Sequence, residues 1–131
     1  MKLENQVCSL ELAQKLKELG FEQESLFYLV EIEYKHFQLL FFEEGWQYKK
    51  EDWKDCEGGE PKHYPAYTSA ELGEILGKYK SVIQTWAVGN NNDCFRCGVV
   101  GFGKESPVID AETEADARAK LLICLKENNL I

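Results

Sequence analysis

Two cysteines that stand three positions apart are the residues of this chain best suited to chemistry. They occur in Cys94-Phe95-Arg96-Cys97-Gly98, a C-x-x-C-G pattern typical of zinc knuckles, where a turn lets two thiolates face one metal ion. A structural zinc site needs two more ligands, and Cys56 and His63 are the plausible donors, although their separation of seven positions is looser than that of a usual ligand pair.

The alternative for these two cysteines is a continuous β-strand. Residues three apart on a strand point to opposite faces, so Cys94 and Cys97 would be unable to chelate one ion. A redox pair would need a helix start after the motif, and the residues from Gly98 onward are not helical in pattern. We favour the strand, which implies no cofactor, and keep zinc as the alternative.

No catalytic motif accompanies the cysteines. His36 and His63 are the two histidines of the chain, and neither G-x-S-x-G nor H-E-x-x-H occurs. The glycine-rich run 98–103 lacks the spacing of a phosphate-binding loop. Glu31 and Glu33 share one strand face, which is typical of a solvated surface. The sequence therefore favours a binding function over an enzymatic one.

Composition and charge narrow the class of protein further. With 131 residues, of which 44% are hydrophobic and 12% aromatic, the chain is long enough for one globular domain spanning 1–131. Its formal net charge is −8 and it has no basic run, so direct nucleic-acid binding is not expected. The acidic surface either keeps the protein soluble or meets a basic partner, and charge alone does not separate the two.

Nothing in the sequence indicates a membrane or an exported protein. The apolar runs are far too short to span a bilayer, and the N-terminus has no apolar signal region. Five cysteines, an odd number, argue against a disulfide framework. We therefore expect a cytoplasmic protein.

Apolar periodicity predicts the elements. Helical spacing recurs in three stretches, which begin at Ser9, at Thr68 or Ser69, and at Thr113. Period-two patterns predict two hairpins, over 26–42 and 81–102. The expected fold is α+β, with an antiparallel sheet of four to five strands, three helices packed mainly on one face, and an αββ-αββ-α order as one possibility. The predicted core residues are Leu12, Leu16, Tyr28, Val30, Ile32, Leu72, Leu76, Leu122 and Leu125.

The segment 43–63 interrupts this pattern. Seven acidic and four basic residues give it a net charge of −3, and glycines and a proline break any regular element. We interpret it as a flexible acidic loop with aromatic anchors. Because Trp and Tyr dominate the energetics of interfaces, the predicted protein-binding surface consists of Trp46, Tyr48, Trp53 and Tyr64.

Three stretches of the chain together match a known pattern. They are Cys8-Ser9-Leu10-Glu11-Leu12-Ala13 with the segments 16–20 and 24–28, Tyr64-Pro65-Ala66-Tyr67-Thr68-Ser69-Ala70-Glu71-Leu72-Gly73-Glu74, and the segment 113–123 with Glu127-Asn128. This combination resembles a family of small uncharacterised proteins encoded by phages and prophages of bacteria. The resemblance leaves out 43–63 and the cysteine pair, and it brings no catalytic residue. It implies an accessory protein that binds a protein partner in the cytoplasm of a bacterial host; the alternative is a small zinc-stabilised domain.

Overall fold

The protein is an α+β fold, which confirms the predicted class. The computed structural model describes residues 2–21, 25–33, 36–41, 62–79, 83–88, 94–99 and 107–131. In chain order the elements are η1 (Leu3–Asn5), α1 (Leu10–Glu18), β1 (Phe27–Glu33), β2 (His36–Phe41), β3 (His63–Pro65), α2 (Ser69–Tyr79), β4 (Ile83–Val88), β5 (Cys94–Val99), β6 (Val108–Ala111) and α3 (Glu114–Glu127).

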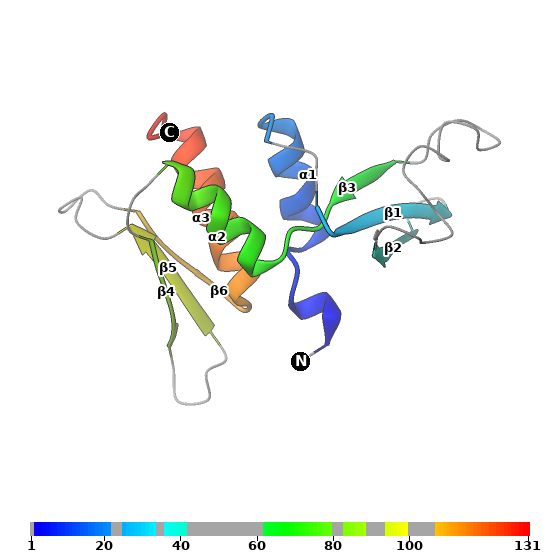
Figure 1. The fold of residues 1–131 in the computed structure, drawn as a ribbon, viewed down its shortest axis with the longest axis horizontal. Helices are drawn as coiled ribbons and strands as arrows, with labels where there is room; N and C mark the ends of the chain where they lie inside the picture. The colour runs from blue at the N-terminus through cyan, green and yellow to red at the C-terminus, as the bar shows by residue number, and fades with distance from the viewer. Residues whose placement is uncertain are drawn as a thin grey trace.

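The strands form two antiparallel sheets of three strands each, in the orders β2-β1-β3 and β4-β5-β6. The prediction of a single sheet of four to five strands was wrong. Each predicted hairpin gains a short third strand of its own, β3 beside β1 and β6 beside β5, so the two hairpins never pair with each other. The helices lie between the two sheets, with α3 against β5 and β6 and α1 against β3 (Figure 1).

Local capping chemistry determines where the three helices begin. The side chain of Ser9 caps α1, and Thr113 caps α3 by accepting the N–H of Asp116 at 3.1 Å. At α2, Thr68 and Glu71 form a complete capping box, in which each side chain accepts the backbone N–H of the other residue at 3.2 and 3.0 Å. All three predicted helix starts are thus confirmed.

The main hydrophobic core surrounds α3, whose buried residues lie on nearly all sides of the helix. Of the predicted core residues, Leu16, Leu72, Leu76, Leu122 and Leu125 are fully buried there, and Leu12 packs against them. Tyr28 and Val30 are also buried, but in a separate small cluster with Leu40 on the first sheet. The side chain of Ile32 lies outside the described residues.

Candidate functional site

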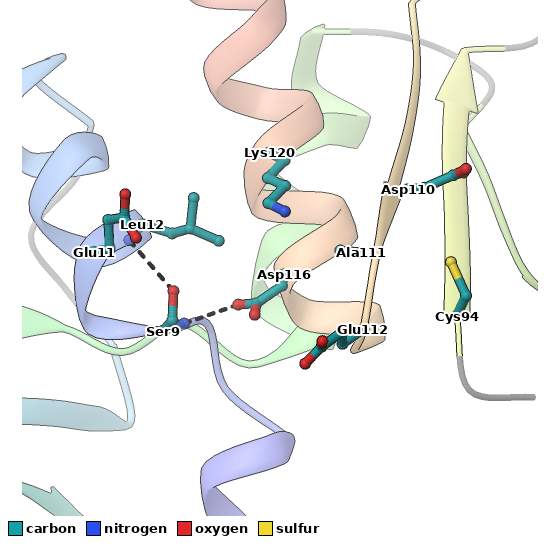
Figure 2. A pocket seen from close by; sticks show the side chains of 9 residues that line it. All are labelled: Ser9, Glu11, Leu12, Cys94, Asp110, Ala111, Glu112, Asp116 and Lys120. Carbon is teal, nitrogen blue, oxygen red and sulfur yellow. Dashed lines mark hydrogen bonds between the residues drawn. The ribbon is translucent and has the colours of Figure 1, made fainter.

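A cleft of about 550 Å³ lies over the N-terminal half of α3, with α1 on one side and the end of β6 on the other (Figure 2). Its lining holds four carboxylates and one ammonium group, which give a formal charge of −3. The lining residues are Ser9, Glu11, Leu12, Cys94, Asp110, Ala111, Glu112, Asp116 and Lys120.

Asp116 positions α1 at the base of this cleft. The backbone N–H of Ser9 donates to Asp116 Oδ1 at 2.8 Å, and the backbone N–H of Asp116 donates to Thr113 Oγ1. The carboxylate is therefore engaged by the entry to α1 rather than by the backbone N–H of Thr113. It lies instead at the N-termini of both α1 and α3, where the helix dipoles favour a negative charge.

The other wall of the cleft is set by an ion pair on the second sheet. Arg96 on β5 binds Asp110 on β6 through two hydrogen bonds, from Nε at 2.7 Å and from Nη2 at 3.1 Å. The hydrogen bond from Arg96 holds the pKa of Asp110 below its usual value. Asp110 is therefore a permanently ionised group at neutral pH.

Two other carboxylates at the cleft have no ion pair of this kind among the described residues. Glu11 on α1 and Glu112 after β6 are both exposed. Within the described part of the chain, neither has a hydrogen bond or an ion pair. Charges of one sign gathered in a cleft concentrate the local field, so these two groups are the ones placed to take a cationic side chain of a ligand.

Cys94 and Cys97 lie in different surroundings on β5. Cys94 and Cys97 lie three apart on this one strand, as the strand interpretation required. Cys97 is buried and its Sγ accepts the hydroxyl of Thr85 at 3.3 Å, whereas Cys94 is partly exposed and lines the cleft. Burial raises the pKa of the Cys97 thiol, which disfavours the thiolate that zinc would need.

The other predicted zinc ligands do not join this pair. His63 lies on β3 in the other sheet, and Cys56 lies outside the described residues. Among the residues that are described, no three His, Cys, Asp or Glu side chains are grouped so as to hold a metal ion. Zinc at these four residues stays a prediction that the geometry of β5 does not favour.

Of the predicted aromatic surface, only Tyr64 can be placed; Trp46, Tyr48 and Trp53 lie outside the described residues. Tyr64 is half-buried on β3, with the Phe37 ring centroid 5.9 Å away and Lys17 Nζ 5.1 Å from its own ring centroid. It therefore packs between α1 and β2, and its role as a binding anchor stays a prediction.

In the residues that the structure covers, no helix is both long and apolar enough to cross a membrane. Comparison with protein-family models, curated proteins and solved structures found no match.

Proposed function

We propose that the protein works by binding a protein partner, as an accessory protein of phage or prophage type, and that the partner presents a basic segment to the cleft between α1 and β6. The observation that carries this proposal is a single cleft whose opposite walls hold Glu11 and Glu112, two carboxylates without an ion pair or hydrogen bond among the described residues. An acidic residue on a convex surface is simply solvated, whereas acidic walls that face one another act together on one ligand.

The charge state of Asp110 favours a binding role for this residue over a role as general acid. A general acid needs a carboxyl group whose pKa is raised toward neutrality. The pKa of Asp110 is instead lowered by the hydrogen bond from Arg96. A carboxylate that stays ionised suits the recognition of a lysine or arginine side chain.

A basic peptide tests this proposal directly. The probe is a capped peptide of eight residues with alternating lysine and valine, because Leu12 and Ala111 place apolar groups beside the carboxylates. We expect it to bind the protein, and we expect binding to weaken as salt is added, since these charges are exposed. A matched peptide of alternating glutamate and valine should not bind.

Paired charge variants locate the binding. The test variant combines Glu11→Gln with Glu112→Gln, and the control combines Glu4→Gln with Glu74→Gln, which are exposed residues outside the cleft. Both change the net charge by the same amount. An exposed ion pair contributes about 0.5 kcal/mol, so losing two should weaken binding roughly fivefold in the test variant alone. Equal weakening in both variants, or no binding of the peptide to the wild type, would refute the proposal.

A further inference from the structure

We infer that the ligand of the cleft binds as an added β-strand along the free edge of β6; this inference rests on the proposed function and specifies its partner. β6 is the last strand in the order β4-β5-β6 and pairs with β5 on one side. Of the strands that the structure describes, none pairs with its other side. An unpaired strand edge presents N–H and C=O groups that can accept another strand.

The cleft lies at the end of β6 and also reaches Cys94, at the start of β5. Asp110 and Ala111 at the end of β6, and Glu112 directly after it, all line the cleft. Successive side chains of a strand point to opposite faces, so a cavity bordered by such consecutive residues reaches both faces of the strand at this end. Val108, earlier on β6, is 54% exposed, so the outer face of this strand is open to solvent at that position.

The negative charge beside the free edge of β6 determines which kind of strand can pair with it. A second copy of this chain pairing through the same edge would bring its own Asp110 and Glu112 against these carboxylates, and like charges on paired strands are destabilising. A basic strand has the opposite effect. We therefore assign the edge to a basic segment of a different protein, and not to a second copy.

The walls of the cleft also predict the pattern of that segment. Asp110 lies on the outer face of the sheet with Arg96, while Ala111 is buried on the face that packs against α3. A strand added beside them has alternate side chains on these same two faces. A basic residue on the outer face would meet Glu112, and the apolar residues beside it would face Ala111 and Leu12 on the helical side.

Backbone methylation of the peptide separates strand addition from other modes of binding. On an edge, the N–H groups of every second residue of the added strand point to the protein. Two versions of the lysine–valine peptide are made, one N-methylated at each lysine and one N-methylated at each valine. We expect one version to bind within about threefold of the parent and the other to lose at least about tenfold, because it loses its donors to β6.

The outcomes distinguish the inference from the proposed function. If the parent peptide binds but both methylated versions bind equally, or lose equally, strand addition is wrong and the basic-segment function stands. If the parent peptide does not bind, both are wrong. Amide chemical shifts of the labelled protein give a second readout: the largest changes are expected at 108–112, and largest changes on β4, the other edge of the same sheet, would overturn the assignment to β6.

Discussion

Replacing Gly73 by alanine should destabilise this protein, although the same change inside a helix ordinarily stabilises one. A Cβ added at Gly73 on α2 would stand 2.7 Å from Nη1 of Arg118. That nitrogen donates to the carbonyl oxygen of Ser69 at 2.7 Å, while Nε donates to Thr85 Oγ1 at 3.0 Å and Nη2 pairs with Glu114 at 3.1 Å. Because contacts to three elements fix the guanidinium, it cannot move away from the new methyl group without weakening at least one of them.

The magnitude follows from two opposing effects. Alanine gains about 0.5–1 kcal/mol over glycine in a helix interior. Losing a hydrogen bond to a charged donor costs about 1.5–3 kcal/mol, and the low end applies because the Arg118 side chain keeps 23% of its exposure to solvent. The net expectation is a loss of roughly 1 kcal/mol in the free energy of unfolding, or about 3–5 °C in Tm for a chain of this size.

Urea denaturation followed by tryptophan fluorescence measures this loss, and Gly77→Ala on the same helix is the matched control. A Cβ at Gly77 meets nothing within 4 Å, so the control should gain about 0.5–1 kcal/mol. In an Arg118→Met background, Gly73→Ala should also become stabilising. If Gly73→Ala stabilises the wild-type protein as much as Gly77→Ala does, the Arg118 guanidinium moves aside at no cost, and the predicted destabilisation is refuted.

Three further predictions concern single residues. Glu71→Ala should lower the free energy of unfolding by about 1–2 kcal/mol, because the carboxylate of Glu71 closes the α2 capping box and also binds the chain entering β1. Equal urea midpoints for Glu71→Ala and the exposed Glu74→Ala would contradict this. Burial raises the pKa of Cys8 to about 12, so iodoacetamide at mildly alkaline pH should alkylate it only in urea; mass spectrometry that finds it modified in the folded protein would count against this. The hydrogen bond from Arg96 lowers the pKa of Asp110, so the ion pair stabilises the fold above the ordinary carboxyl pKa, and this stabilisation is lost as pH falls through the lowered pKa. Asp110→Asn should therefore destabilise the protein at neutral pH but not in strong acid. A difference in urea midpoint that does not change with pH would contradict this role of the ion pair.

The parts of the fold that local chemistry determines were predictable from the sequence. Helix starts depend on a capping side chain and the residues within one turn of it, so Ser9 and Thr113 were identified correctly, and Thr68 was one of the two candidates for α2. The third strand of each sheet was not predictable. β3 has three residues and ends at Pro65, and β6 has four, so neither carries enough alternation to signal a strand. Their pairing also depends on contacts far apart in the chain.

The cleft could not be predicted from the sequence, because it also depends on contacts between residues far apart in the chain. The hydrogen bond that places α1 beside α3 joins Ser9 and Asp116, which stand 107 positions apart. The acidic residues in the first turn of α3 are visible in the sequence, but the helix dipole alone accounts for them and indicates no cleft. The strand interpretation of Cys94 and Cys97 succeeded because it needed only the parity of one strand.

The carboxylates of the cleft divide into those that hold the fold and those that are open to a ligand. Asp116 accepts the N–H of Ser9 and so joins α1 to α3, and Asp110 pairs with Arg96 across β5 and β6. Changing either one alters structure and charge together. Glu11 and Glu112 lie on opposite walls without a partner among the described residues, so replacing them removes charge and leaves the walls in place. Loss of peptide binding in that double variant can therefore be attributed to recognition rather than to unfolding.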